Sequence, residues 1–77
     1  MKYWVGYNDG RDSAGFREIS VRNPADAAEI YAAEEWDAGR HQDEYELLVQ
    51  LDARKWEATV EVRTEFDAYL VPVKEAK

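Results

Sequence analysis

The sequence predicts an α+β fold: a single antiparallel sheet with one helix packed on one face, in the order strand, strand, helix, strand, strand, strand. Two C-terminal segments alternate apolar and polar residues with a period of two, which is typical of half-buried strands. A segment in the first half of the chain carries helix start and stop residues. The 77 residues predict one domain, 1–77.

The N-terminal segment predicts a hairpin. Aromatic and β-branched residues indicate a first strand over Tyr3–Tyr7, and Asn8-Asp9-Gly10 is a turn signal because glycine tolerates positive φ. A second strand follows over Phe16–Val21. The polar residues 11–15 between them predict a long hairpin tip, or a bulge near Gly15.

The helix is predicted to start after Asn23 and to run to Ala38. Asn23 can cap the helix, Pro24 suits its first position, and Asp26 lies near the positive end of the helix dipole. Gly39 is the expected C-terminal stop.

The helix also shows two faces when its residues are placed at ~100° per step. One arc is apolar and is expected to meet the sheet; it holds Ala25, Ala28, Tyr31, Ala32 and Trp36. The opposite arc is acidic, with Ile30 and Ala33 among the acids. Glu35 falls within the apolar arc, so we expect it at an edge of that arc or extended toward solvent.

Three strands are predicted in the second half of the chain. They cover Tyr45–Leu51, Trp56–Arg63 and Ala68–Val73, with a four-residue turn at 52–55 and a tight turn at 64–67. Pro72 cannot donate to a ladder, so it belongs at an edge or near the strand end. Residues 74–77 are expected to be a frayed tail.

The first C-terminal hairpin predicts a like-charge pair. If Leu51 faces Trp56, the apolar residues of both strands pair with one another. The same register places Glu46 opposite Glu61 and Glu44 opposite Arg63. A cross-strand pair of like charges is unfavourable, by a few tenths of a kcal/mol up to roughly 1 kcal/mol. The acids expected on the sheet face away from the helix are Glu44, Glu46, Glu57 and Glu61.

The charge is concentrated in one segment. Eight acids and one permanent base, Arg40, lie between residues 26 and 46, and they account for the whole net charge of −7. This balance argues against direct binding of nucleic acid or an anionic membrane, which require Lys and Arg, and it permits a basic partner. The residues predicted to bind that partner are Asp26, Glu29, Glu34, Asp37, Asp43, Glu44, Glu46 and Glu61. The alternative is a well-solvated surface.

The two groups of acids need not form one surface. The helix acids and the hairpin acids are expected on opposite sides of the molecule. They could meet only around an edge, with Asp43 and Glu44 as the bridge.

No catalytic or metal-binding motif stands out. The single histidine, His41, is expected in an exposed loop without a nucleophile or further ligands, so we predict no enzyme, no cofactor and no metal. The aromatic residues expected in the core or at its edge are Trp4, Tyr7, Phe16, Trp36 and Trp56. No apolar run reaches the ~20 residues of a membrane span, and there is no cysteine, which together predict a soluble cytoplasmic protein.

The segment from Glu18 to Trp36 resembles the strand–proline–helix unit of many small phage and bacterial α+β proteins, among them some anti-CRISPR proteins. The length, the absence of cysteine and the acidic balance are similar to that group. The resemblance implies inhibition of a CRISPR–Cas effector through its basic DNA-binding surface, in the cytoplasm of the host cell if the protein is phage-encoded. The group has no shared motif, so the resemblance assigns no functional residue.

Two functions therefore stay open. The first is an acidic inhibitor that mimics the charge of DNA. The second is an interaction or structural module, a monomer or a homodimer, in which an exposed edge strand carrying Val71 and Val73 pairs with another chain.

Overall fold

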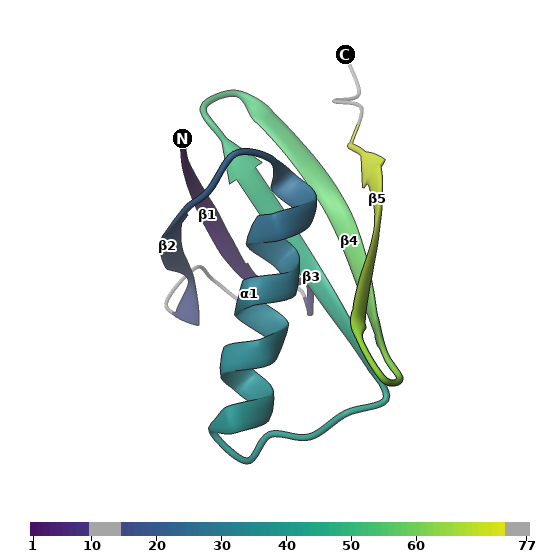
Figure 1. The fold of residues 1–77 in the computed structure, drawn as a ribbon. Helices are drawn as coiled ribbons and strands as arrows, with labels where there is room; N and C mark the ends of the chain where they lie inside the picture. Colours follow the sequence, from purple (N-terminus) through teal and green to yellow (C-terminus); the bar gives the residue numbers. More distant parts are fainter. Residues whose placement is uncertain (10–14, 74–77) are drawn as a thin grey trace.

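The α+β prediction is confirmed. In the computed structural model, which describes residues 1–9 and 15–73, the described chain forms five strands and one helix in the predicted order. The elements are β1 (Lys2–Tyr7), β2 (Arg17–Ser20), α1 (Pro24–Asp37), β3 (Glu44–Leu51), β4 (Arg54–Val62) and β5 (Phe66–Pro72). The strands lie in the order β2-β1-β3-β4-β5, and each is antiparallel to its neighbours (Figure 1). Residues 11–14 of the predicted hairpin tip (11–15) and the predicted tail at 74–77 fall outside the described residues.

Both ends of the helix are capped as local sequence rules require. The side chain of Asn23 accepts a 2.8 Å hydrogen bond from the backbone N–H of Asp26, and Pro24 occupies the first turn. The helix ends at Asp37, one residue before the predicted end. Gly39 takes φ = 89° there, and its N–H and that of the next residue turn back onto the last helical carbonyls, which is the Schellman geometry.

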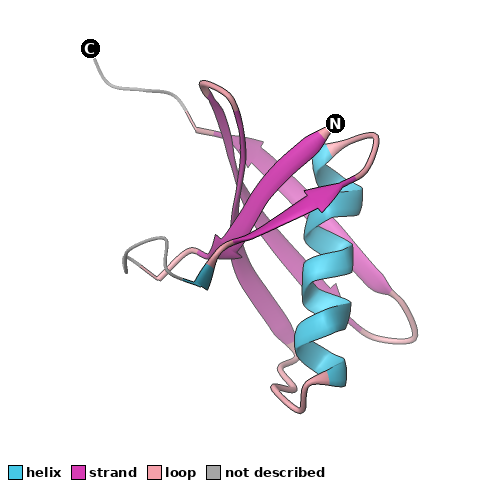
Figure 2. Cartoon of the chain, turned by 90° about the vertical axis from the view of Figure 1, so that its left-hand side faces the viewer, coloured by secondary structure: helices cyan, strands magenta, loops and turns pink. Residues whose placement is uncertain are grey.

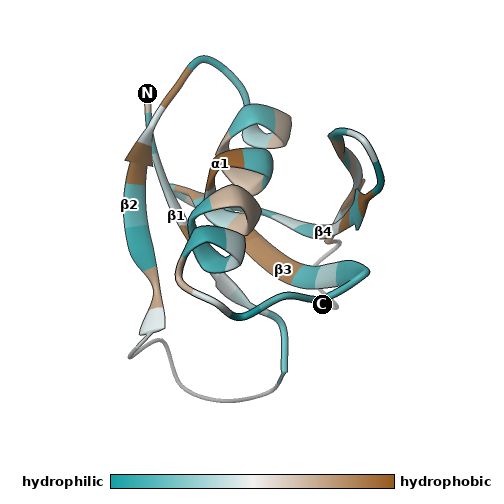
Figure 3. Cartoon of the chain, turned by 60° about the horizontal axis from the view of Figure 1, so that its bottom comes forward, coloured by the Kyte–Doolittle hydropathy of each residue, from teal (hydrophilic) through white to brown (hydrophobic). Residues whose placement is uncertain are grey.

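The helix covers one face of the sheet, and among residues 1–9 and 15–73 no helix or strand covers the other, which we call the bare face (Figure 2). The buried core lies between these two layers: Tyr3, Val5, Ile19, Ala27, Ala28, Tyr31, Ala32, Tyr45, Leu47, Val49, Ala58 and Val60. Figure 3 shows β3 apolar beneath the helix and hydrophilic at one end. The small alanines of α1 allow close approach to the sheet, and aromatic rings fill the remaining space.

The predicted register of the β3–β4 hairpin is wrong by two residues. The connection is the two-residue loop Asp52–Ala53, so Leu51 faces Arg54 and Val49 faces Trp56. Asp52 adopts φ = 54°, a left-handed conformation that aspartate tolerates better than most residues, and this permits the short loop. Because side chains alternate with a period of two, a shift by two changes the cross-strand partners without changing faces.

The edge strands are β2 and β5, and Pro72 lies at the end of β5 as predicted. β5 begins at Phe66, two residues earlier than expected, because the connection from Val62 spans only residues 63–65. No helix among the described residues has the length and apolar character needed to cross a membrane.

One aromatic expectation is wrong. Trp4 is 40% exposed and lies on the bare face of the sheet, where its ring is 6.3 Å from that of Phe16. Phe16 in turn covers Gly6, which is buried for that reason. A Cβ atom at Gly6 would overlap the Phe16 ring. The absence of a side chain at Gly6 therefore permits this aromatic pair to lie flat against β1.

We predict that Gly6→Ala lowers the free energy of unfolding by about 1–3 kcal/mol, because the new methyl group displaces the Phe16 ring. Urea unfolding followed by tryptophan fluorescence measures the change. Gly15→Ala is the matched control: a Cβ atom there meets nothing within 4 Å, so we expect a change within about 0.5 kcal/mol. If Gly6→Ala is equally destabilising in a Phe16→Ala background, the clash is not the cause.

Candidate protein-binding surface

The bare face of the sheet carries both apolar and acidic side chains. The register places them in rows that cross the strands. One half of the face holds Trp4, Leu48 and Val71, with Glu57 between Leu48 and Val71 as expected for this face, and Val71 is 65% exposed. The other half holds Tyr69, which is 57% exposed, together with acids. A mixture of exposed aromatic, aliphatic and charged side chains is typical of protein-binding surfaces.

Three carboxylates stand side by side across β3, β4 and β5. Glu44 faces Glu61, and Glu61 faces Asp67. We call this the carboxylate row. Adjacent strands are only about 5 Å apart, so each pair is a direct like-charge neighbour. The predicted pairing of Glu46 with Glu61 and of Glu44 with Arg63 is therefore wrong, because the register shift brings Glu44 rather than Glu46 opposite Glu61.

The carboxylate row is poorly compensated. Its basic neighbour is Arg63, whose Nη2 lies 3.0 Å from Glu61 Oε2, but this arginine is 76% exposed and the pair is screened by solvent. A hydrogen bond with Glu46, then desolvation and repulsion from Glu46 and Glu61, raise the pKa of Glu44. Glu46 faces Thr59, whose hydroxyl is 3.4 Å from a Glu46 oxygen. The folded state thus holds these acids closer together than they would be in the unfolded chain.

Acidic side chains continue from the row around the β5 edge onto the helix. Burial, followed by repulsion from Asp26, Asp67 and Glu65, raises the pKa of Glu29, while a hydrogen bond with the backbone of Ala68 opposes the rise. Asp67 belongs both to the carboxylate row and to the surroundings of Glu29. The two acidic faces that the sequence left separate are therefore joined at the β5 edge. We call the joined set the acidic band: Asp26, Glu29, Glu65, Asp67, Glu61, Glu44 and Glu46.

Five of the eight predicted binding residues lie in the acidic band, and the others do not. Glu34 lies 3.1 Å from Arg17 on the side of the helix that faces β2. Asp37 is exposed in the last helical turn. Asp43 is exposed beside the start of β3, where its carbonyl accepts a hydrogen bond from Val62.

Sequence reasoning missed Glu65 and Asp67. Both lie outside the acid-rich segment 26–46; Glu65 lies in the β4–β5 turn, whose length was misjudged, and Asp67 follows it in β5. The alternation in the β4–β5 hairpin contained the signal, since pairing Val62 with Phe66 places Glu61 opposite Asp67.

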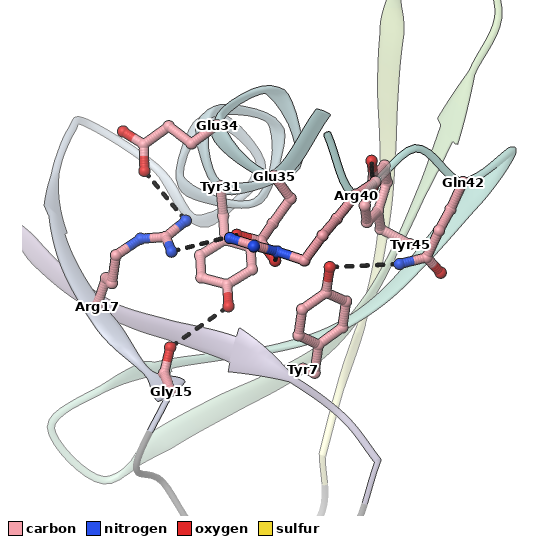
Figure 4. Close-up of polar contacts among 9 residues, drawn as sticks. All are labelled: Tyr7, Gly15, Arg17, Tyr31, Glu34, Glu35, Arg40, Gln42 and Tyr45. Carbon is pink, nitrogen blue, oxygen red and sulfur yellow. Dashed lines mark hydrogen bonds and ion pairs between the residues drawn. The ribbon is translucent and has the colours of Figure 1, made fainter. Parts of the chain in front are cut away.

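A second group of charges is centred on Glu35 beneath the helix and is structural; its partners Arg17 and Arg40 reach solvent, with side chains 39% and 58% exposed. Glu35 is only 2% exposed, contrary to the expectation that it would reach solvent. Arg40 donates to both of its oxygens, at 2.7 and 2.8 Å, and Arg17 donates from β2 at 3.3 Å (Figure 4). These hydrogen bonds, opposed by desolvation and assisted by one from Tyr7, lower the pKa of Glu35 to about 2. Burial and the nearby Glu35 raise the pKa of Tyr7 above its ordinary value.

Aromatic residues also contact the charged group around Glu35. The Arg17 guanidinium lies 4.1 Å from the centre of the Tyr31 ring, and the Tyr45 hydroxyl donates to the Arg40 carbonyl at 2.6 Å. Gln42 donates to the Tyr7 hydroxyl at 3.3 Å. A carboxylate held ionised by two guanidinium groups is a poor proton donor or acceptor near neutral pH, so the group anchors the helix rather than performing acid–base chemistry.

His41 lies in the connection after the helix, exposed as predicted, and stacks on Trp36 with 4.2 Å between ring centres. Among residues 1–9 and 15–73, no group of three or more His, Asp or Glu side chains could hold a metal ion. No protein-family model, curated protein or solved structure matches the chain.

We predict that Glu35→Gln lowers the free energy of unfolding at pH 7 by about 3 kcal/mol. The pKa of Glu35 lies below the ordinary 4.5, so its contribution is complete above about pH 4.5 and is lost as the pH falls toward 2. Urea unfolding of the variant and the wild type at pH 7, 4 and 2.5 measures the difference between their free energies of unfolding, which should shrink as the pH falls. Glu34→Gln is the control, since this residue is 54% exposed and should contribute under about 1 kcal/mol. A difference between Glu35→Gln and wild type that persists undiminished at pH 2.5 would contradict the assignment.

We predict that Glu44→Gln raises the thermal midpoint at pH 7 and low salt, because it removes repulsion within the carboxylate row. The gain is largest while Glu44 is ionised, and it should shrink as acid protonates this residue or as salt screens it. Calorimetry at low and high salt provides the measurement. Glu18→Gln removes the same charge from a site 3.9 Å from Lys2, and it should give no gain. Equal gains for both variants would mean that net charge alone matters.

Proposed function

We propose that this protein is a non-enzymatic inhibitor that binds a basic, nucleic-acid-binding surface of another protein and blocks it by charge mimicry. The observation that carries the proposal is the carboxylate row, Glu44, Glu61 and Asp67. Like charges placed directly opposite one another destabilise a sheet, and exceptions to such local rules are expected at functional sites. Lysine and arginine side chains that normally hold phosphates would neutralise this row.

The position of the row favours a protein partner. It lies on the sheet face that no element of the described chain covers, beside the exposed Tyr69, and Trp4 and Val71 are exposed on the same face. Aromatic side chains supply the apolar contact that makes a charged interface specific, while the charges accelerate association. A solvated surface serving solubility alone would not require neighbouring acids or exposed aromatic rings.

The resemblance of residues 18–36 to small anti-CRISPR proteins narrows the proposal. On this basis, the proposed partner is a CRISPR–Cas effector and the proposed blocked site is its DNA-binding channel. The proposed place of action is the cytoplasm of the host cell. In this proposal the protein itself binds no nucleic acid, membrane or cofactor.

The alternative, self-association through an edge strand, has one observation in its favour. β5 is at the edge of the sheet and Val71 is 65% exposed. Against it, two copies would each bring a net charge of −7, and pairing at β5 would bring Asp67 and its acidic neighbours close together. Sedimentation equilibrium separates the two, because the inhibitor proposal expects a monomer at low salt and the alternative a dimer.

We predict that the protein displaces labelled target DNA from a purified CRISPR–Cas effector at 50 mM NaCl. At 300 mM NaCl, the protein concentration needed for half-maximal displacement should be roughly tenfold higher. The pair Glu44→Gln/Glu61→Gln should weaken displacement. The matched control pair, Asp37→Asn/Asp52→Asn, also removes two charges but lies outside the acidic band, and it should retain most of the activity. Equal losses for the two pairs, or displacement insensitive to salt, would contradict charge mimicry through the carboxylate row. If effectors of every type fail to respond, the partner assignment is wrong.

A further inference from the structure

A groove of about 560 Å³ runs between α1 and β5 at the edge where the acidic band turns onto the helix. Its apolar lining consists of Ile30, Ala33 and Phe66. Ile30 is 38% exposed, an unusual position for isoleucine on a helix whose other large apolar side chains face the sheet. The groove therefore presents apolar surface that the fold leaves uncovered.

The rim of the same groove is acidic. Glu29 comes from the helix, while Glu65 and Asp67 come from the end of the β4–β5 connection and from β5. These three carboxylates do not form a metal site among the described residues.

An apolar floor with an acidic rim complements one kind of side chain in particular. Lysine and arginine both carry a methylene stem that packs on apolar surface and a charged end that seeks carboxylates. Arginine fits better, because its planar guanidinium can donate to two carboxylates at once and can stack on an aromatic ring. Phe66 offers such a ring in the groove lining.

We propose that this groove receives one arginine side chain of the basic partner, with its stem on Ile30 and Phe66 and its guanidinium between Glu29 and Asp67. The proposal rests on the proposed function and deepens it by naming an anchor residue. A single arginine buried at the centre of such a contact is a common energetic hot spot.

The electrostatics of the groove agree with this occupant. Burial and repulsion from neighbouring acids raise the pKa of Glu29, so the folded structure makes its ionised form less favourable than it is for a solvated glutamate. A guanidinium beside Glu29 would attract its carboxylate and so offset the repulsion from the neighbouring acids. The charged groups that act on Glu29 among the described residues are acids, Asp26, Asp67 and Glu65, so a cation from the partner would be favourable here.

The test uses nona-arginine peptide as the probe and isothermal titration calorimetry at low salt. Two variants act on the groove by different means: Glu29→Gln removes a charge from the rim, and Ala33→Leu fills the floor without changing charge. We expect each to weaken nona-arginine binding roughly tenfold. Glu18→Gln, at the opposite edge of the sheet, removes one charge and should change binding less than twofold. Thermal unfolding of each variant confirms that it is folded.

The outcomes separate the groove from the acidic surface as a whole. The groove proposal is overturned if Ala33→Leu leaves salt-sensitive binding unchanged. It is also overturned if Glu18→Gln and Glu29→Gln reduce binding equally. In either case the acidic band is left as the binding surface. Nona-lysine binding as tightly as nona-arginine, with the same sensitivity to both groove variants, overturns the choice of arginine. No binding of either peptide at low salt overturns the proposed function itself.

Discussion

A single helix of 14 residues can bury apolar side chains on only one face of the sheet. The core therefore lies entirely between α1 and that face, and the opposite face must be stable in contact with solvent or with a partner. The sequence places polar and acidic residues there, together with exposed aromatic rings. The distribution of charge and the position of the candidate surface both follow from this unequal coverage.

The buried Glu35 determines how the helix lies on the covered face. Arg40 contacts Glu35 twice, through its side chain and through a backbone hydrogen bond at the end of the helix. Arg17 joins the same carboxylate from β2. The Arg17 contact ties the helix to β2, and the Arg40 contacts fix the end of the helix. The side toward β5 is held by apolar packing, including the ring of Trp36 against Phe66, and there the groove remains open.

Local signals in the sequence were sufficient to predict the helix, the strands and the face on which each side chain lies. They were insufficient to predict features that depend on residues distant in the chain. Asn23, Pro24 and Gly39 act within one turn of the helix, so its ends were predicted to within one residue. Strand faces followed from alternation. The β3–β4 register depended on whether Asp52 would adopt a left-handed conformation, which the composition of the turn did not decide. The burial of Glu35 depended on Arg17, which is 18 residues away in the chain. The junction of the acidic faces depended on how β5 lies against the helix.

The carboxylate row places like charges opposite one another on neighbouring strands, an unfavourable arrangement in a sheet. Its effect is seen at Glu44, whose pKa is raised by Glu46, by desolvation and by Glu61. A bound cationic surface would convert that repulsion into attraction, so the free protein would hold a site that is completed by its partner. The apolar side chains nearby would then determine where the partner lies.

The most direct test of this account is the pKa of the Glu44 carboxyl, measured by carbon-detected NMR titration in the free protein and with saturating nona-arginine peptide. The account predicts a value above the ordinary range in the free protein and a value below that range in the complex, because guanidinium groups replace carboxylates as its dominant neighbours. A pKa that the peptide leaves unchanged, while the peptide is bound, would show that the carboxylate row is not the binding surface.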